Sequence, residues 1–248
     1  AAARTARYAA LRAAARKTGA AAVLLAHTLD DQAETVLIDL IRAAGTDAMA
    51  GMPASQTVDG TLFLRPLLDV ARAETTAICG QLGLDYWDDP TNGDGVPAGE
   101  PLDVSYPLRS RVRHDLLPAL SAFAGRDMAR RLADGARVAR RDVELLDRLA
   151  DGACERAVTF DGDTARIDAR RLADEDEAIR FRVVARVLAR CAPGSGSRHV
   201  EAVEALVSRW HGQGPVTLPS KHVGFRWKHV IEVCEDVTHA NRRRARQD

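Results

Sequence analysis

The sequence is poor in cysteine and in aromatic residues, and it has no long apolar run. Its four cysteines lie far apart, at Cys79, Cys154, Cys191 and Cys234. They form no CxxC pair and no cluster with histidines, which argues against a zinc site and against a disulfide framework. No stretch approaches the roughly 18 apolar residues of a membrane span, and no signal-peptide pattern opens the chain. We therefore expect a cytoplasmic protein without a membrane partner.

A net charge is also lacking. The 248 residues contain 35 Lys and Arg and 35 Asp and Glu, which gives a formal net charge of zero. A nucleic-acid partner is therefore not indicated by the total charge, and any basic binding surface must be local. The length is sufficient for one large domain or for two of moderate size.

Residues 23–35 are the most informative stretch. Four apolar residues, Val23–Ala26, come directly before His27, and the carboxylates of Asp30 and Asp31 follow a short turn. The apolar run has the length of a strand buried on both faces. Apolar residues then recur at the spacing of one helical stripe, at Ala33, Val36, Leu37, Leu40, Ile41 and Ala44. His27, Asp30 and Asp31 are therefore expected where a parallel strand is followed by a helix, the edge at which open α/β sheets bind ligands.

Helix capping is the simpler explanation of the same residues. An Asp at a helix start accepts backbone N–H bonds, and Asp31 with Glu34 three residues later resembles a capping box. Capping explains one Asp and the Glu. It does not explain His27, the second Asp or Gln32 in the same turn, so the pattern favours a functional role.

This stretch and several later blocks resemble a known family. The block His27-Thr28-Leu29-Asp30-Asp31-Gln32-Ala33-Glu34-Thr35 is similar to the signature of tRNA(Ile)-lysidine synthases, which are pyrophosphatase-loop ATP enzymes. The later blocks follow in the family's order: Gly51-Met52, Arg65-Pro66-Leu67-Leu68, Arg72-Ala73-Glu74, Asp89-Pro90-Thr91-Asn92 and Arg109-Ser110-Arg111-Val112-Arg113. The resemblance covers residues 1–120 closely, although the family usually has Asn in place of Ser110.

The resemblance implies an α/β fold, a doubly wound parallel sheet of the adenine nucleotide alpha-hydrolase type. The family carries a Ser-Gly-Gly-x-Asp-Ser loop near its N-terminus, whose backbone amides hold the ATP phosphates. We find no Gly-rich phosphate loop in the 248 residues; Gly212-Gln213-Gly214 precedes a proline and no helix. The expectation is therefore an ATP domain that is incomplete at its N-terminus, with the phosphate loop absent from this chain.

Periodicity predicts the order of elements. Helices are expected over residues 2–17, ending at Gly19, and from Pro66 to about Leu82, with Ala71, Thr75, Ile78 and Leu82 as the apolar stripe. Residues 61–64 are expected to form a strand, and two strand-then-helix units favour a parallel sheet. Residues 93–107, rich in Gly and Pro, are expected to form a loop longer than the family usually has. A helix from Arg109 would place Arg109 and Arg113 on one face and Arg111 elsewhere.

The remaining chain predicts further domains. We expect the ATP-binding part over residues 1–124, a charged linker helix over 125–152, a small α+β substrate (tRNA)-binding domain over 153–236 and a basic disordered tail over 237–248. In the small domain, an Asp161-Gly162 turn between alternating runs predicts a hairpin. Two helices, near 175–191 and 198–210, and two strands between Gly212 and Cys234 are expected to follow.

The resemblance implies ATP-dependent ligation of L-lysine to carbon 2 of the wobble cytidine in the CAU anticodon of tRNA(Ile). The implied catalytic residues are His27, Asp31, Glu34 and Arg113. His27 or one of the carboxylates would act as a base, Asp31 and Glu34 would face the lysine ammonium groups, and Arg113 with Arg109 would meet the phosphates. The implied substrate-binding residues are Asp30, Arg65, Arg72, Asn92, Arg109 and Arg111. Mg²⁺ is implied with ATP, no residue is expected to bind a metal directly, and a homodimer is left open.

Three alternatives stay open. Arg109 and Arg113 could belong to a solvated basic helix end. The enzyme could be a tRNA thiolase of the same superfamily, although such enzymes usually need cysteines that are not placed for it here. The chain could also be a tRNA-binding fragment without ATP chemistry, since the phosphate loop is absent.

Overall fold

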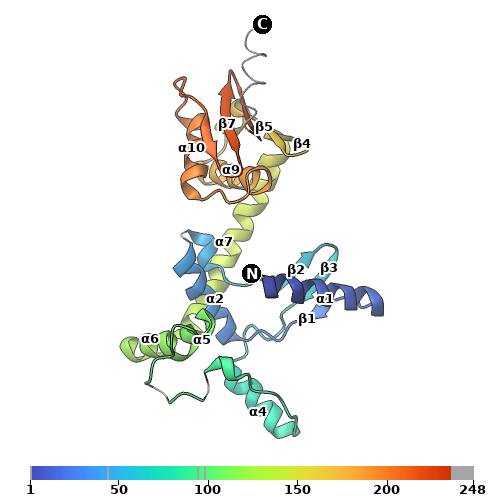
Figure 1. The fold of residues 1–248 in the computed structure, drawn as a ribbon, viewed down its shortest axis with the longest axis vertical. Coiled ribbons are helices and arrows are strands. Elements are labelled where there is room, and N and C mark those ends of the chain that lie inside the picture. Colours follow the sequence, from blue (N-terminus) through green and yellow to red (C-terminus); the bar gives the residue numbers. More distant parts are fainter. Residues whose placement is uncertain (1, 44, 94, 98, 236–248) are drawn as a thin grey trace. The chain divides into compact units, whose positions relative to one another are not determined.

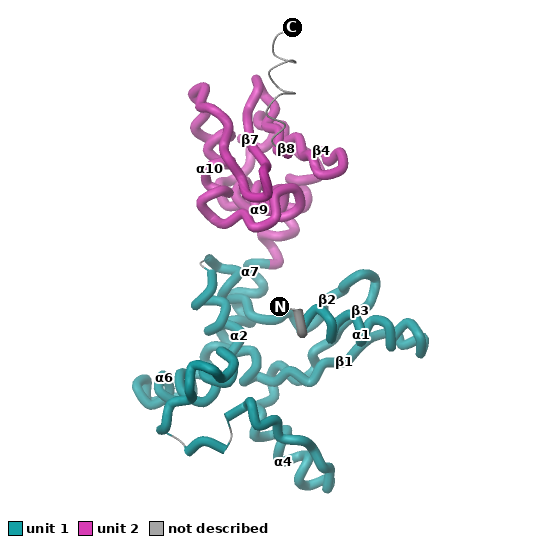
Figure 2. The backbone as a smooth tube through the Cα atoms, in the orientation of Figure 1, with its two compact units in different colours: residues 1–143 teal, residues 144–248 magenta. Residues whose placement is uncertain are grey.

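The computed structural model describes residues 2–43, 45–93, 95–97 and 99–235. The chain divides into two compact units, residues 1–143 (unit 1) and 144–248 (unit 2) (Figure 2). The basic tail expected over residues 237–248 lies outside the described residues. All the blocks that carry the family resemblance fall in unit 1.

Unit 1 contains a small mixed sheet. Its strands are β1 (Val23–Leu24), β2 (Ser55–Val58) and β3 (Thr61–Leu64), in the order β1-β3-β2 (Figure 1). β1 and β3 are parallel, as the two strand-then-helix units predicted, whereas β2 pairs antiparallel with β3. The prediction missed β2, although Asp59 and Gly60 both have positive φ, the requirement of a two-residue type I′ hairpin turn.

β1 differs from its prediction. A strand buried on both faces was expected, but β1 is an edge strand and the side chain of Leu24 is 68% exposed. The expectation of two-sided burial is therefore wrong for this strand. The direction of the chain is as expected, because β1 leads through His27 into the first long helix of the motif.

Helices make up much of the rest of unit 1. They are α1 (Ala2–Thr18), α2 (Leu29–Arg42), α3 (Thr46–Met49), α4 (Arg72–Leu82), α5 (Leu108–Arg111) and α6 (Leu117–Ala124). A 3₁₀ turn, η1 (Pro90–Asn92), and a π-helical turn, η2 (Val112–Leu116), complete the set. Ala33 and Ile38 of α2 pack with Val112 and Leu117 in one buried cluster. The stripe predicted for α4 is wrong, because Ile78 and Leu82 are 49% and 66% exposed.

Unit 2 is an α+β domain. The boundary between the units falls inside α7 (Met128–Ala157). The antiparallel sheet has the order β4-β5-β8-β7-β6, with bounds β4 (Val158–Asp161), β5 (Thr164–Asp168), β6 (Val216–Leu218), β7 (His222–Trp227) and β8 (Val230–Glu235). The β4–β5 hairpin was predicted; β7 was missed. The helices are α8 (Ala169–Ala173), α9 (Glu177–Cys191) and α10 (Ser197–Ser208).

Candidate active site

The first turn of α2 is capped by Thr28. The Asp31 backbone N–H donates to Thr28 Oγ1 at 3.4 Å, and the Thr28 backbone N–H donates to Asp31 Oδ2 at 2.8 Å. The capping box therefore consists of Thr28 and Asp31, and the pairing of Asp31 with Glu34 that we considered is wrong. Asp31 uses one carboxylate oxygen for the cap and keeps the other, and Glu34 has no part in capping.

Five residues form a charged cluster at this helix end, which we call the arginine–carboxylate cluster: Asp31, Glu34, Arg72, Arg109 and Arg113. Glu34 has no exposed surface. Arg113 Nε and Nη2 contact its two oxygens at 2.7 and 3.2 Å, and Arg72 Nη2 lies 3.3 Å from Oε1. This bidentate geometry is the strongest form of a charge-assisted contact, so Glu34 fixes the Arg113 side chain.

The remaining oxygen of Asp31 faces the same arginines. Asp31 Oδ1 lies 3.2 Å from Arg72, 3.7 Å from Arg113 and 3.8 Å from Arg109. Burial alone would raise the pKa of Asp31, but the Thr28 backbone N–H and the charge of Arg72 outweigh it and lower that pKa. Asp31 is therefore a carboxylate at neutral pH.

Asp30 joins two helices. Its Oδ2 accepts a hydrogen bond of 2.6 Å from the Arg72 backbone N–H at the start of α4. The Leu29 backbone N–H also donates to the Val70 carbonyl at 2.9 Å. The starts of α2 and α4 are thus tied together, which carries the Arg72 side chain to the cluster.

Two of the three predicted arginines reach the cluster. Arg109 and Arg113 both reach Glu34, as their spacing predicted, while Arg111 lies near Asp103 and Asp115. π turns inside helices occur frequently at functional sites. The structure therefore brings Arg109 and Arg113 into the cluster and leaves Arg111 outside it.

The same turn holds part of the long loop. His114 Nε2 lies 3.1 Å from the Val96 carbonyl oxygen, and His114 Nδ1 lies 2.8 Å from Asp115 Oδ1. The Leu102 backbone N–H donates to the Asp115 carboxylate at 3.2 Å. Leu102 itself is buried. The described part of residues 95–107 is therefore attached to the π turn at two points.

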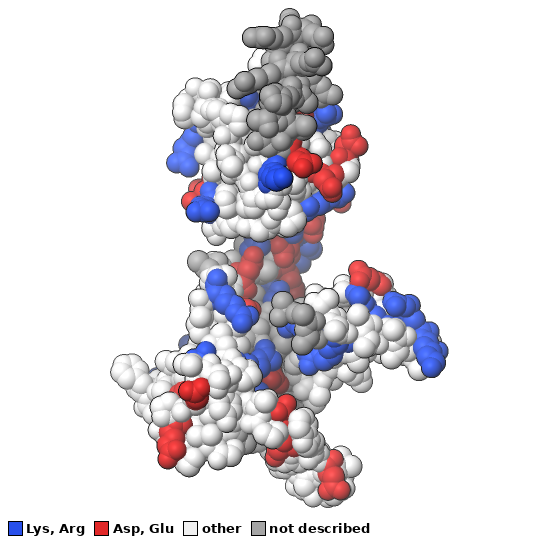
Figure 3. Space-filling model, in the orientation of Figure 1, with Lys and Arg blue, Asp and Glu red and all other residues white. Residues whose placement is uncertain are grey.

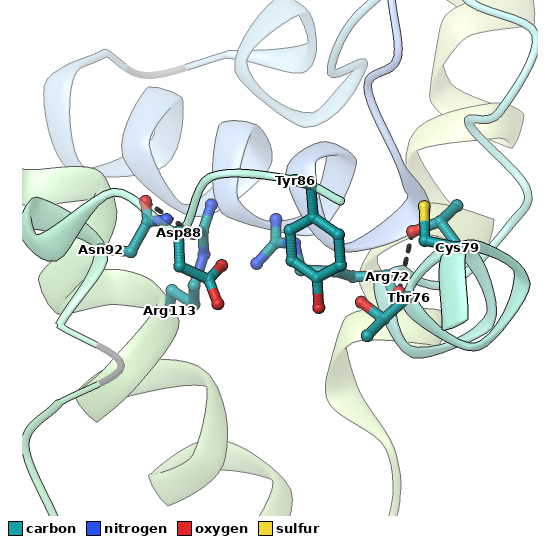
Figure 4. A pocket seen from close by; sticks show the side chains of 8 residues that line it. Arg72, Thr76, Cys79, Tyr86, Asp88, Asn92 and Arg113 are labelled. Atoms are coloured by element: carbon teal, nitrogen blue, oxygen red, sulfur yellow. Dashed lines mark hydrogen bonds between the residues drawn. The ribbon is translucent and has the colours of Figure 1, made fainter. Parts of the chain in front are cut away.

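A pocket of about 260 Å³ opens beside the cluster (Figure 4). Its lining residues are Arg72, Thr75, Thr76, Cys79, Tyr86, Asp88, Asn92 and Arg113. Asn92 Oδ1 accepts a hydrogen bond of 3.2 Å from Arg113 Nη1. In Figure 4, Asp88, Asn92 and Arg113 lie on one side of Tyr86, and Thr76 and Cys79 lie on the other. Sequence reasoning did not identify Tyr86 or Thr76, and neither carries a local motif that could have revealed it.

His27 lies at the end of β1, close to the cluster. Burial lowers the pKa of His27; the Asp31 carboxylate opposes this effect, and the charges of Arg65 and Arg109 add to it. Its Nδ1 is buried and makes no hydrogen bond within the described part of the chain. His27 is therefore a neutral imidazole at pH 7.

Two other motif residues hold the backbone. The Gln32 side-chain amide bonds both the carbonyl and the N–H of Met52, at 2.9 and 2.8 Å, and a Cβ at Gly51 would lie 2.8 Å from Gln32 Cδ. Arg65 is buried and donates to the Pro53 carbonyl at 2.7 Å and to the Tyr8 hydroxyl at 3.2 Å. The structure therefore does not place Arg65 in the arginine–carboxylate cluster.

Two searches over the described residues found nothing. No group of three or more His, Cys, Asp and Glu side chains in those residues could hold a metal ion. None of the helices in that part of the chain is long and apolar enough to cross a membrane.

Comparisons with known proteins agree over both units. Residues 1–120 match a family model described as a PP-loop domain, and residues 168–230 match one described as a TilS substrate binding domain. A tRNA(Ile)-lysidine synthase of Bifidobacterium animalis subsp. lactis is 60% identical over 262 residues, covering 100% of this chain and 69% of the relative. Proteins of the same name from Bifidobacterium longum subsp. infantis and Streptomyces coelicolor are 51% and 42% identical, covering 98% and 91% of this chain and 69% and 61% of the relatives.

Proposed function

The chain belongs to the tRNA(Ile)-lysidine synthase family, and we propose that its pocket beside the arginine–carboxylate cluster is where ATP-dependent ligation of lysine to tRNA(Ile) takes place. The enzyme is a carbon–nitrogen ligase. The cytidine oxygen at carbon 2 attacks the α-phosphorus of ATP and pyrophosphate leaves; the lysine ε-amine then attacks carbon 2 and AMP leaves. The observation that carries the site is the convergence of Asp31, Glu34, Arg72 and Arg113 on one helix end.

Incorporation of labelled lysine tests this function. The chain, joined to a phosphate-loop segment of the family, is incubated with unmodified tRNA(Ile) transcript, labelled lysine and ATP. We expect ATP-dependent transfer of label to the RNA with release of AMP and pyrophosphate. A transcript whose wobble cytidine is replaced by uridine should take up no label. Sulfur transfer in place of lysine transfer would favour the thiolase alternative, for which Cys79 is the one cysteine among the pocket residues.

Arg113 is proposed to stabilise the charge that develops on the phosphates. Glu34 and Asn92 hold its guanidinium at three hydrogen-bonding contacts, and such preorganised donors are the most effective form of electrostatic catalysis. Arg109 donates to Thr35 Oγ1 at 2.9 Å, but it contacts Glu34 and Asp31 only at 3.7 and 3.8 Å, and its side chain is 35% exposed. Arg109 is therefore the cluster arginine that can most easily turn toward a bound phosphate.

Asp31 and Glu34 are proposed to bind the ammonium group of lysine. Both carboxylates face arginines in the structure, so an incoming ammonium group must replace one of these contacts. The long contacts of Arg109 make it the easiest partner to replace. If Arg109 turns toward a bound phosphate, the carboxylates of Asp31 and Glu34 can pair with the lysine ammonium group. Nucleotide binding would then favour lysine binding.

Replacing Asp31 with Asn should raise the KM for lysine by at least 10-fold, because the amide cannot pair with an ammonium group, while α2 stays folded. Thr28→Ala is the matched control. It removes the cap, at a cost of about 0.5–2 kcal/mol of stability, and keeps the carboxylate. Lysine-dependent single-turnover rates and thermal melts of both variants make the comparison. Normal lysine dependence in Asp31→Asn would leave capping as the role of Asp31.

His27 is proposed to accept the proton of the lysine amine. The base must be neutral, so the rate should rise with pH through a pKa below 6.5 and then level off. His27→Gln should remove this acidic limb and slow the lysine step. His211→Gln, which changes an exposed histidine of unit 2, should leave the profile unchanged. An identical pH profile in His27→Gln would rule out this role.

Mg²⁺ is proposed to arrive with the nucleotide, held through the phosphate oxygens. The described side chains do not form a protein-held metal site, so we assign it no ligand here. ATP is a substrate, and Arg113 and Arg109 are the residues of this chain proposed to meet its phosphates.

The other parts of the chain are proposed to serve tRNA binding. Figure 3 shows Lys and Arg gathered along α1, which carries Arg4, Arg7, Arg12, Arg16 and Lys17. Local basic surfaces of this kind meet the phosphate backbone. We propose that α7 is the linker helix between the ATP-binding and tRNA-binding parts, and that the enzyme works in the cytoplasm.

A further inference from the structure

The sheet of unit 2 has one face packed against helices. On this face Ile231 and Val233 of β8 have no exposed surface. Arg226 Nη1 of β7 donates to the Leu206 carbonyl of α10 at 2.6 Å, and a Cβ at Gly224 would lie 3.1 Å from Val203 of α10. Because side chains alternate along a strand, the neighbours of Gly224 and Arg226 on β7 point to the opposite face.

Two aromatic side chains of β7 therefore lie on this opposite face, against which none of the described helices packs. They are Phe225, which is partly buried, and Trp227, which is 66% exposed. Residues two apart on a strand are separated by roughly 7 Å, a spacing that suits stacking on successive bases. Phe225 pairs in register with Glu232 of β8, which pairs with Arg166 of β5. The three form one row across the sheet.

Cations accompany the aromatic side chains. Lys228 Nζ lies 5.9 Å from the centre of the Trp227 ring. The Arg166 side chain is 53% exposed and pairs with Glu232 at 3.1 Å. The polar residues Thr159 and Thr217 occupy the same face in the outer strands, opposite Arg166 and Val223 in register. Trp227 lies opposite Val230 in register, so the exposed indole belongs to a small apolar patch that is bordered by these polar and charged groups.

The turn that carries Trp227 is held in place. Arg226 Nε donates to the Lys228 carbonyl at 2.9 Å, and the Arg226 guanidinium lies 5.4 Å from the centre of the Trp210 ring. On the other side, the Ala169 backbone N–H donates to the His229 carbonyl at 2.7 Å. An aromatic side chain on such a rigid support loses little conformational entropy when it binds a ligand.

We propose that Trp227, with Phe225 beside it, stacks on an unpaired base of the tRNA, and that Lys228 contacts an adjacent phosphate. This rests on the proposed function, which makes tRNA the substrate. Aromatic side chains on an open sheet face beside cations are the usual means of binding unpaired RNA bases. A stable dimer interface would instead need a larger apolar patch than Phe225, Trp227 and their aliphatic neighbours supply.

The affinity for tRNA and its salt dependence together distinguish a stacking contact from a charge contact. Trp227→Ala should weaken binding of the tRNA(Ile) transcript about 10-fold, within the range for loss of one base–aromatic stack, with an unchanged salt slope. Trp227→Phe should keep most of the affinity. Lys228→Ala should reduce the slope of log K against log salt by about 0.7–0.9. Leu149→Ala, which shortens a half-exposed apolar side chain of α7 in the same unit, is the matched control and should change neither quantity.

A blunt RNA duplex without unpaired bases completes the test. Trp227→Ala should not alter binding of the duplex, and in lysidine formation its KM for tRNA should rise by about the same factor as the dissociation constant of the tRNA. Unchanged tRNA affinity in Trp227→Ala would overturn the proposal, as would a change of oligomeric state in place of affinity, which would identify a dimer contact. Stacking-dependent tRNA binding by a wild-type protein that forms no lysidine would support this inference and refute the proposed function.

Discussion

Glu34→Ala is expected to destabilise unit 1 by about 3–5 kcal/mol, the usual result of removing one partner from a buried ion pair. Glu34 has no exposed surface, and its two oxygens meet Arg113 and Arg72 at 2.7–3.3 Å. Alanine would leave these guanidinium groups facing a cavity. Lysidine formation should fall to background, because Arg113 loses its fixed position and the lysine site loses a carboxylate.

Amide hydrogen exchange, measured peptide by peptide, shows which part of unit 1 is destabilised. Amides of α2 and η2 should exchange faster in Glu34→Ala, and those of α9 in unit 2 should not change. Asp39→Ala is the matched control, since Asp39 is on the same helix and its side chain makes no ion pair with any described residue. Wild-type exchange rates in Glu34→Ala would show that the arginines do not depend on Glu34.

Arg113→Lys is expected to slow single-turnover adenylation by about 100- to 1,000-fold, the range for loss of one preorganised donor. Lysine keeps the charge but cannot make the bidentate contact with Glu34 or reach Asn92 at the same time. The affinity for tRNA should change little, because at most one phosphate contact is affected. Single-turnover adenylation is measured beside a salt titration of tRNA binding.

A triple variant that removes the charges of Arg130, Arg137 and Arg141 should affect tRNA binding and leave adenylation unchanged. These residues lie on α7 outside the motif, so their loss should flatten the salt slope of tRNA binding without slowing adenylation. If Arg113→Lys weakened tRNA binding and left adenylation intact, Arg113 would be a tRNA clamp and our assignment of its catalytic role would be wrong.

Local signals in the sequence predicted the parts of the structure that depend on neighbouring residues. The helical period of α2 and the Asp-Gly turn of the β4–β5 hairpin were readable, because each arises within a few residues, although Leu40 and Ile41 of the predicted α2 stripe are 45% and 57% exposed. The parallel direction of β1 and β3 followed from the two strand-then-helix units. β7 was missed for a local reason as well. Its turn to β8, at Lys228 and His229, contains no Gly, Asn or Asp to mark it, so only the later part, with Val230, Ile231 and Val233, was predicted as a strand.

The sequence predicted which residues belong to the candidate site, but it did not predict which of them contact one another. The motif blocks named Glu34 and Arg113, but their contact joins residues 79 positions apart, and no periodicity carries that information. The apolar stripe of α4 failed because Ile78 and Leu82 are largely exposed, and a helical period identifies a face without saying what covers it. Tyr86 entered the site only through the path of the backbone after α4.

The attachment of the long loop has a consequence for protein engineering. Asn92 and Arg113 are joined by a hydrogen bond across 21 positions, and the loop between them is held at Val96 and Leu102. Val104, just beyond these anchors, is 79% exposed. Lengthening a flexible loop costs little, about 0.6 kcal/mol for each doubling. A fluorescent tag or an affinity peptide inserted between Val104 and Ser105 should therefore leave both ends of the loop, and the arginine beyond it, in place.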